Sequence, residues 1–322
     1  MLEKAGGALV APTLAEIRKA RERIHGRVLR TPLIRLHGEA GREIFLKLEN
    51  LQPTGSFKMR AACNAMAAAE PGQLARGVYT ASAGNMAQGV AWNARARGLA
   101  ARIIVPDHAP QNKVSAIEAL GGTVVKVPFE AWWEILVRNG SPTEQGYFIH
   151  PVCQSEVIAG NGTIGLELAE DLPDVDTVIV PYGGGALSSG IAIALRELCP
   201  RARVYASEVE TAAPLAPSLA AGEPVSVKYQ ASFVDGIGSA SVLPAMWPIV
   251  SRVLAGSRVV SLREVENAVR RLFLSHRLVA EGAGASSLAA ALEYTQPGER
   301  VVCVISGGNI DIATLARIVE GR

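Results

Sequence analysis

The sequence lacks the features that mark several classes of protein. Its net charge is only +2, with 32 Lys and Arg against 30 Asp and Glu, and its basic residues form no long run. Nothing therefore indicates binding to nucleic acid or to a membrane surface. No stretch reaches the roughly 18 apolar residues of a membrane span, and MLEKAGGALV at the amino terminus lacks the basic and hydrophobic regions of a signal peptide. We expect a cytoplasmic protein.

Cysteine and histidine are also too scattered to indicate a metal site or a disulfide framework. The four cysteines have no CxxC spacing and are Cys63, Cys153, Cys199 and Cys303. Their surroundings are apolar or helical, where a cysteine is usually a small buried hydrophobe, so we predict reduced thiols. His108, His150 and His276 have no mutual spacing that suggests a metal site or a triad, so they receive no role.

The sequence does contain a long alternation of β-rich and helical segments. Hydrophobic residues make up 49% of its 322 residues, enough for a sizeable core. The β-rich segments EIFLKLE, GVYTAS, ARIIVP and TVVKVP are each followed by a helical one, and the alternation resumes around DTVIVP, RVYASEVE and RVVCVIS. This order predicts βαβ units, and therefore an α/β protein with two sets of mainly parallel strands.

Four of the strand-to-helix turns have unusual composition. They read PTGSFK, TASAGNMAQ, VPYGGGALSSG and VISGGNID. In open α/β sheets, ligands bind at the carboxyl ends of the strands, where such turns gather. The turns therefore predict a ligand site that they share.

The turn with three consecutive glycines resembles a phosphate cradle. Gly183, Gly184 and Gly185 follow a buried strand, and a helix is expected to begin near Ala186 or Leu187. Glycines let backbone N–H groups converge, and the helix N-terminus favours an anion. The spacing fits neither GxGxxG nor GxxxxGK[ST], so a phosphate monoester is favoured over a dinucleotide or a nucleoside triphosphate. A tight turn without a ligand is the alternative.

The other turns offer polar groups for the rest of a ligand. Ser82 and Gly84 could receive a carboxylate through the hydroxyl and backbone N–H groups, and the Asn85 amide could bond a ring hydroxyl. Ser306 could bond a ring nitrogen without fixing a positive charge on it. Taken alone, each stretch is equally consistent with a helix cap or a plain turn.

Taken together, the motifs resemble the fold type II pyridoxal-phosphate enzymes, in the group of the threonine/serine dehydratases and serine racemases. The matching stretches run in order through RTPLIRL, LENLQPTGSFKMRAA, ASAGNMAQ, HPVCQSEVIAGNGTI, VPYGGGALSSGIA and SGGNID. The resemblance implies a tryptophan synthase β-like fold of two open, mainly parallel α/β domains. The large domain would comprise residues 1–48 and 149–322, and the small inserted domain residues 49–148. Pyridoxal 5′-phosphate would bind in the cleft between them, and the enzyme would be a homodimer.

The resemblance also implies roles for individual residues. Lys58 would form the Schiff base with the cofactor and act as general base, as a neutral amine whose pKa is depressed by burial. The residues expected to bind the cofactor are Phe57, Asn85, Gly183, Gly184, Gly185, Ala186, Leu187 and Ser306. The residues expected to bind the amino-acid substrate are Ser82, Ala83, Gly84 and Met86.

The reaction implied is β-elimination from a β-hydroxy amino acid, which yields a 2-oxo acid and ammonia. A serine near the pyridine nitrogen leaves the ring neutral, which favours prompt loss of the β-substituent. Threonine or serine is the default substrate, with an aryl-serine such as phenylserine, or hydroxyaspartate, as alternatives. Less favoured are β-replacement of the cysteine synthase kind and a pyridoxal-phosphate-binding protein without catalytic activity.

Two departures from the family pattern bear on the substrate. The racemases carry a serine where this chain has Ala83, so two-base racemisation would lack its second base. Most relatives have histidine where this chain has Met86. If Met86 faces the substrate, it favours a bulkier or more apolar β-substituent; if it packs inside the protein, it says nothing about specificity.

Two further expectations concern cations and regulation. Glu208 matches the first carboxylate of the family's divalent-cation loop, but the later acidic position falls in TAAPLAP. We therefore expect no tight metal site, and at most a weak cation site near Glu208. Because the chain stops soon after SGGNID, we also expect no C-terminal regulatory domain of the kind found in the biosynthetic threonine deaminases.

Overall fold

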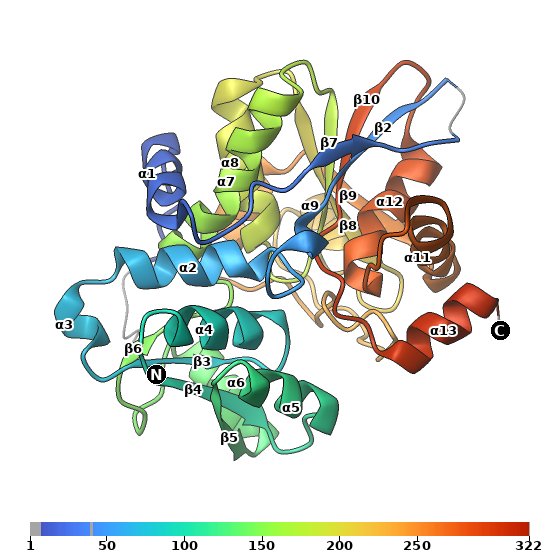
Figure 1. Cartoon of the computed structure of the whole chain (residues 1–322). Coiled ribbons are helices and arrows are strands. Elements are labelled where there is room, and N and C mark those ends of the chain that lie inside the picture. The colour runs from blue at the N-terminus through green and yellow to red at the C-terminus, as the bar shows by residue number, and fades with distance from the viewer. Residues whose placement is uncertain (1–7, 39–40, 322) are drawn as a thin grey trace. The chain divides into compact units, whose positions relative to one another are not determined.

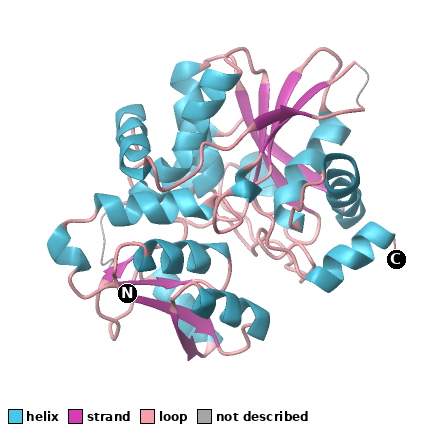
Figure 2. Ribbon diagram, viewed as in Figure 1, coloured by secondary structure: helices cyan, strands magenta, loops and turns pink. Residues whose placement is uncertain are grey.

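The computed structural model describes residues 8–38 and 41–321, and it divides the chain into two compact units (Figure 1). The smaller unit comprises Met1–Val28 and Lys58–Asn161, and the larger comprises Leu29–Phe57 and Gly162–Arg322. Each unit contains one sheet with helices beside it (Figure 2). The predicted α/β class with mainly parallel sheets is confirmed. The predicted small domain, residues 49–148, has other boundaries than the smaller unit. One reason is that the first helix, Leu14–Ile24, packs against the helix Lys58–Ala68 and so is grouped with it.

The smaller unit has a four-stranded sheet in the order β5-β4-β3-β6, in which all neighbours are parallel. Its strands are β3 (Val78–Ala81), β4 (Ala101–Pro106), β5 (Thr123–Val127) and β6 (Tyr147–Phe148). Its helices are α1 (Leu14–Ile24), α2 (Lys58–Ala68), α3 (Pro71–Leu74), α4 (Asn85–Arg95), α5 (Gln111–Ala119) and α6 (Phe129–Val137). Helix α7 (Ser155–Asp171) begins in this unit and runs on into the larger one.

The larger unit has a six-stranded sheet in the order β1-β2-β10-β7-β8-β9. Its strands are β1 (Leu33–Arg35), β2 (Glu43–Lys47), β7 (Thr177–Pro181), β8 (Arg203–Val209), β9 (Gly256–Val260) and β10 (Arg300–Val304). Among these described strands, β1 alone runs antiparallel to its neighbour. The helices are η1 (Glu49–Leu51, a 3₁₀ turn), α8 (Ala186–Leu198), α9 (Leu215–Ala221), α10 (Trp247–Val253), α11 (Leu262–His276), α12 (Gly282–Tyr294) and α13 (Ile312–Glu320).

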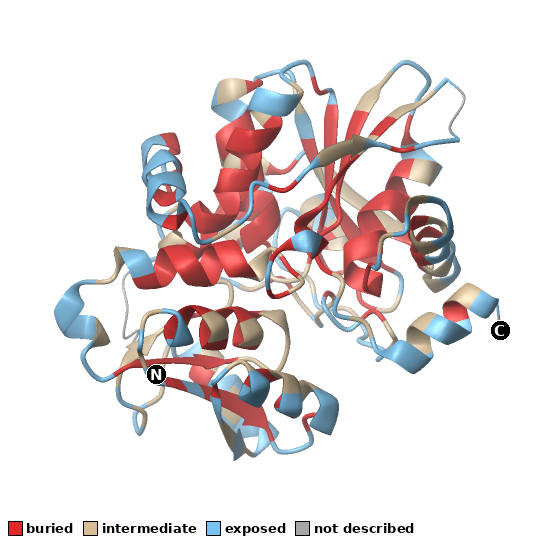
Figure 3. Ribbon diagram, viewed as in Figure 1, coloured by how far each residue is buried: buried red, intermediate tan, exposed pale blue. Residues whose placement is uncertain are grey.

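The core of the larger unit lies on its central strands. Every residue of β7 is buried, and β10 is buried from Val301 to Val304 (Figure 3). Such continuous apolar runs are typical of parallel strands covered on both faces. Helix α12 packs across β7, β8, β9 and β10, and α8 packs on β7 and β8. This packing fixes the positions of the strand ends, and therefore of the turns that follow them.

The structure bears on two of the features that the sequence lacks. All four cysteines are free thiols. Among residues 8–38 and 41–321, no helix is both long enough and apolar enough to cross a membrane.

Candidate active site

Three of the four unusual turns gather at one edge of the larger sheet. Strands β2, β10 and β7 are neighbours and run parallel, so their carboxyl ends lie at the same edge. Residues 48–57 follow β2, residues 305–309 follow β10, and residues 182–185 follow β7. The folding of this unit therefore brings together segments that are far apart in the sequence.

The turn that precedes Lys58 is bonded directly to the turn after β10. The Phe57 N–H donates to the Ser306 carbonyl at 2.9 Å, and the Gly308 N–H donates to the Gly55 carbonyl at 2.9 Å. Ser56 and Gly307 also form an antiparallel bridge. These bonds fix the backbone position of Phe57, the residue directly before Lys58. The Ser306 residue is itself only 3% exposed.

The glycine loop after β7 has the geometry of an anion cradle. Gly185 is the N-cap of α8, with φ of +92°, and no side chain among the described residues caps this helix. A Cβ at Gly185 would lie 2.7 Å from Val250 Cγ1, so only glycine fits. Upstream, the Tyr182 N–H is held by the Ser207 carbonyl of β8 at 2.9 Å. The loop therefore ends at the uncapped N-terminus of a 13-residue helix, which attracts an anion.

The residues of this edge fit a phosphate ester of pyridoxal. The helix N-terminus supplies N–H groups for a phosphate, and glycine leaves room for it to approach. Nearby in the same unit, Ser56 is fully buried, and its hydroxyl has no hydrogen-bond partner within the part of the chain that the structure describes. An unpartnered buried hydroxyl is costly unless a ligand or water uses it.

The fourth turn lies in the smaller unit, between β3 and α4. The Ser82 N–H donates to the Ile104 carbonyl at 3.0 Å, and the Ser82 hydroxyl accepts the Gly84 N–H at 3.3 Å. Ser82, Ala83, Gly84 and Asn85 are all partly exposed. Met86 is only 1% exposed. The turn therefore presents its first four residues outward and buries the fifth.

Lys58 is the first residue of α2, and this helix is held very closely by its neighbours. A Cβ at Gly89 of α4 would lie 3.1 Å from the Lys58 carbonyl oxygen, and a Cβ at Gly160 of α7 would lie 2.7 Å from the Arg60 carbonyl oxygen. Glycine at both positions lets the three helices approach each other. The position of Lys58 is therefore set by backbone packing and does not depend on a flexible loop.

The Lys58 amine lies in a setting that favours its neutral form. Its Nζ donates to the Pro151 carbonyl at 2.7 Å. Burial lowers the pKa of this amine from 10.5 to about 8. A lysine that is partly neutral near neutral pH is suited to act as a base or as a nucleophile.

Sequence reasoning assigned no role to the segment that contacts Lys58. Pro151 follows β6, the neighbour of β3, so its loop lies at the same sheet edge as Ser82. The adjacent His150 is 4% exposed, and burial lowers its pKa to about 4. The signal available in the sequence was a His-Pro pair directly after a short β-rich segment.

Glu208 is fully engaged by hydrogen-bond donors. Its carboxylate accepts the N–H groups of Leu215 at 2.8 Å and Ala216 at 2.9 Å, and the Ser257 hydroxyl at 2.6 Å. Burial raises the pKa of this carboxyl. Among the residues that the structure describes, no three His, Cys, Asp or Glu side chains cluster as metal ligands would. The weak cation site near Glu208 stays a prediction.

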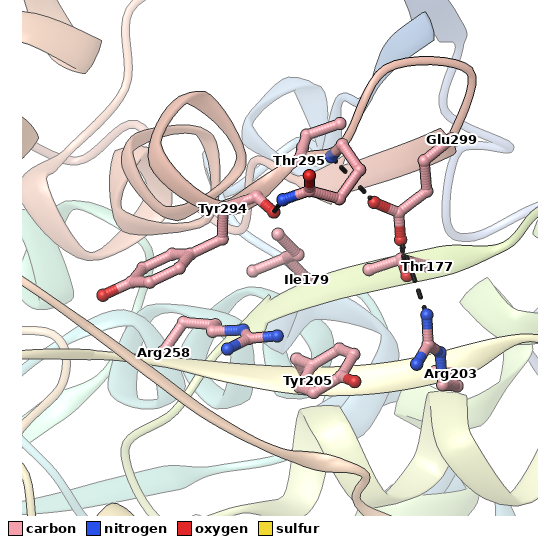
Figure 4. A pocket seen from close by; sticks show the side chains of 9 residues that line it. Thr177, Ile179, Arg203, Tyr205, Arg258, Tyr294, Thr295 and Glu299 are labelled. Carbon is pink, nitrogen blue, oxygen red and sulfur yellow. Dashed lines mark hydrogen bonds and ion pairs between the residues drawn. The ribbon is translucent and has the colours of Figure 1, made fainter. Parts of the chain in front are cut away.

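A small cavity of about 120 Å³ lies at the opposite edge of the larger sheet (Figure 4). It is lined by Thr177, Ile179, Arg203, Tyr205, Arg258, Tyr294, Thr295, Gln296 and Glu299. Glu299 is bonded by Thr177 and lies 3.9 Å from Arg203, and Arg258 lies over the ring of Tyr205. These residues lie in the first halves of β7 and β8, in β9, and in the segment from the end of α12 to the start of β10. The cavity is therefore separate from the predicted site residues of this sheet.

Comparison with known proteins agrees with the resemblance seen in the motifs. Residues 24–307 match the family model described as "Pyridoxal-phosphate dependent enzyme". An L-threonine ammonia-lyase of Thermotoga maritima is 38% identical, over 96% of this chain and 78% of the relative. The catabolic L-threonine dehydratase TdcB of Escherichia coli K12 is 36% identical, over 94% of each chain. The structure of maize serine racemase superposes with a TM-score of 0.88 at 33% identity, covering 97% of this chain and 98% of that one.

These matches span nearly the whole chain and include the strand-end turns described above. They confirm the predicted fold type II class and its pyridoxal-phosphate dependence. The chain belongs to the family of pyridoxal-phosphate dependent enzymes.

Proposed function

We propose that this protein is a pyridoxal-phosphate dependent ammonia-lyase that converts a β-hydroxy amino acid, threonine or serine, into a 2-oxo acid and ammonia. The observation that carries the proposal is the Lys58 amine at the start of α2, which donates to the Pro151 carbonyl at 2.7 Å and has its pKa lowered by burial to about 8, in a chain of this family. Relatives named as L-threonine ammonia-lyase and L-threonine dehydratase, at 36–38% identity over nearly the whole chain, support the same reaction.

Lys58 acts as the base that removes the substrate's Cα proton. With a pKa of about 8, about a tenth of the amine is neutral at pH 7, whereas an ordinary lysine would be neutral to only about 0.03%. The cofactor, when bound, supplies the electron-withdrawing group that makes this proton removable. Loss of the β-hydroxyl then gives, after hydrolysis, the 2-oxo acid and ammonia.

The cofactor-binding residues have the roles predicted from the sequence. The proposal assigns the phosphate to Gly183, Gly184, Gly185, Ala186 and Leu187, because they form the loop and first turn of the uncapped helix α8. Phe57 would pack beside the ring, Asn85 would bond the ring hydroxyl and Ser306 would bond the ring nitrogen. We retain residues 49–148 as the proposed small domain and the rest as the large one.

The substrate residues favour a small β-hydroxy amino acid. Ser82 and Gly84 receive the substrate carboxylate, since their turn is partly exposed at the strand end. The 1% exposure of Met86 supports the alternative in which it packs inside the protein, so it gives no reason to expect an aryl-serine. Ala83 carries no hydroxyl, which argues against racemisation.

The test is to load the purified enzyme with pyridoxal phosphate and to measure ammonia and 2-oxo acid formed from L- and D-serine, L-threonine, threo-phenylserine and 3-hydroxyaspartate. We expect the highest kcat/KM with L-threonine or L-serine, and no activity in Lys58→Ala. Lys58→Arg keeps the charge but not a titratable amine, and should be equally inactive. A protein that binds no cofactor, or whose ammonia release survives Lys58→Ala, would rule the proposal out. Consumption of added sulfide without ammonia release would indicate β-replacement.

We also propose that the enzyme works in the cytoplasm as a homodimer. Its four free cysteines suit a reducing compartment. Sedimentation of the loaded enzyme should give twice the 33.8 kDa mass of the chain. Sedimentation as a monomer at the concentrations of the assay would overturn the proposed assembly.

A further inference from the structure

The loop between β6 and α7 contains several hydrogen bonds among its own residues. The His150 N–H donates to the side-chain carbonyl of Gln154 at 3.2 Å, and the Gln154 N–H donates to the Val152 carbonyl at 2.9 Å. The Gln154 amide donates in turn to the Tyr147 hydroxyl at 2.6 Å. These bonds make the loop a rigid connection, although it has no regular secondary structure.

The buried imidazole of His150 is the centre of this loop. Its Nδ1 accepts two backbone N–H groups, from Val152 at 2.9 Å and from Cys153 at 2.7 Å. Its Nε2 lies 3.3 Å from the Leu136 carbonyl in α6. A nitrogen that accepts two N–H groups carries no proton, and a carbonyl can only accept, so the proton must be on Nε2. The neighbours of His150 therefore require one neutral tautomer.

A single peptide group connects this imidazole to Lys58. The Pro151 carbonyl, which accepts from Lys58 Nζ, and the Val152 N–H, which donates to His150 Nδ1, belong to the same planar unit. In a trans peptide the two groups point in opposite directions, so rotating the plane would break both bonds at once. The proline ring further restricts the backbone on one side of this peptide. The orientation of the carbonyl thus depends on His150.

We propose that His150 is a positioning residue for Lys58: through the Val152 N–H it orients the Pro151 carbonyl, and that carbonyl holds the Lys58 amine in place when the amine is not bonded to the cofactor. Lys58 remains the catalytic residue, and His150 touches neither substrate nor cofactor in this scheme. The inference deepens the proposed function, because it explains how the base is aimed.

The surroundings of His150 fit this role. The ring is packed edge-on against Phe148, with centroids 5.9 Å apart, and the titratable groups that face it are Lys58, Cys153 and, through Gln154, Tyr147. Burial raises the pKa of Cys153 to about 12 and also raises that of Tyr147, so both stay neutral. No opposite charge among these groups stabilises an imidazolium.

The inference is tested with three substitutions at His150. His150→Leu removes the acceptor. His150→Asn restores it, because an asparagine oxygen readily accepts the backbone N–H groups two and three residues further on, here those of Val152 and Cys153. His150→Phe keeps a flat ring without an acceptor, and serves if the leucine variant does not fold. His108→Leu is the matched control, because that side chain is 66% exposed. Circular dichroism and thermal melting establish that each variant is folded.

The first readout uses cofactor-free protein and does not depend on activity. Acetic anhydride acetylates only neutral amines, and mass spectrometry of the peptide containing Lys58 gives the rate against pH. We expect a midpoint near the Lys58 pKa of about 8 in the wild type, the asparagine variant and the His108 control. In His150→Leu, or His150→Phe, the loosened loop admits water to the amine, so the midpoint should rise by about half a unit or more.

The second readout is the kinetics of the loaded enzyme. A misplaced base should lower kcat by about 10- to 100-fold in His150→Leu or His150→Phe, with little change in KM, and the acid limb of the pH profile should move upward. His150→Asn should recover most of kcat. An unchanged acetylation midpoint together with unchanged kcat in folded leucine or phenylalanine variants would overturn the inference. If the midpoint moves as expected but the wild type releases no ammonia, the proposed function is wrong and the positioning role stands.

Discussion

A Cβ placed on Gly55 would lie 2.5 Å from the side-chain oxygen of Asn309. The same asparagine donates from its Nδ2 to the Thr54 carbonyl at 2.9 Å. The turn that leads into Lys58 is thus in close contact with the turn after β10, and glycine at 55 makes that contact possible. Two motifs at opposite ends of the chain therefore form one structural unit.

This contact predicts a specific loss of stability in Gly55→Ala. Gly55 has φ of +70°, so alanine there costs about 1–2 kcal/mol for the left-handed backbone, and displacing Asn309 should cost a further ~1 kcal/mol through its hydrogen bond. Gly26→Ala is the matched control, because Gly26 has φ of +72° and nothing within 4 Å of its Cβ position. Urea unfolding should show a larger loss for Gly55→Ala. Equal losses would mean that the contact with Asn309 contributes nothing.

The glycine loop predicts weaker cofactor binding in Gly185→Ala. The added Cβ meets Val250 at 2.7 Å and φ is +92°, so the loop must shift away from the N-terminus of α8. We expect the Kd for pyridoxal phosphate, titrated by its visible absorbance, to rise at least about tenfold, equivalent to ~1.4 kcal/mol. Gly222→Ala also introduces a Cβ at positive φ but meets nothing within 4 Å, and should leave the Kd unchanged. Unchanged binding in Gly185→Ala would contradict the phosphate assignment.

The parts of the fold that were predicted are those set by local sequence patterns. The segment RVVCVIS became β10 because a continuous apolar run bounded by charged and glycine residues suits a buried parallel strand. Strand β9 was not predicted. Its residues Gly256–Val260 form a half-exposed edge strand after a proline-rich segment, and a five-residue edge strand shows no clear apolar run. The antiparallel β1, only three residues long, was missed for the same reason.

The candidate site residues that the sequence suggested carry their signal in side chains or in glycines at strand ends. Lys58 and Gly185 are examples, since each lies in a turn of unusual composition. The role of the loop after β6 was not predictable, because its contact with Lys58 is made by the Pro151 backbone carbonyl. Every residue has such a carbonyl, so its orientation by His150 leaves no mark in the sequence other than an isolated histidine.

Burial of His150 predicts how stability depends on pH in the cofactor-free protein. The folded protein binds a proton on this ring only near pH 4, whereas the unfolded chain does so near 6.5. Between these values the unfolded state binds more protons, so the free energy of unfolding falls as the pH is lowered from 6.5 to 4, by about 3 kcal/mol from this residue alone. His150→Gln lacks this titration. Urea unfolding at pH 7 and pH 4 should therefore show a smaller acid loss in the variant, and equal losses would contradict the prediction.

Met86→Ala distinguishes the two alternatives for the methionine that replaces the family's histidine. With 1% exposure, Met86 packs inside the protein, and its truncation should lower the free energy of unfolding by about 2–4 kcal/mol. In this interpretation the side chain does not face the substrate. The ratio of kcat/KM for threo-phenylserine to that for L-threonine should therefore differ from the wild-type ratio by less than about threefold, a difference in activation free energy of less than about 1 kcal/mol. Val90→Ala, also fully buried in α4, controls for a general effect of destabilising this helix. A tenfold change in the ratio with Met86→Ala, absent in Val90→Ala, would show that Met86 faces the substrate and would return an aryl-serine to consideration.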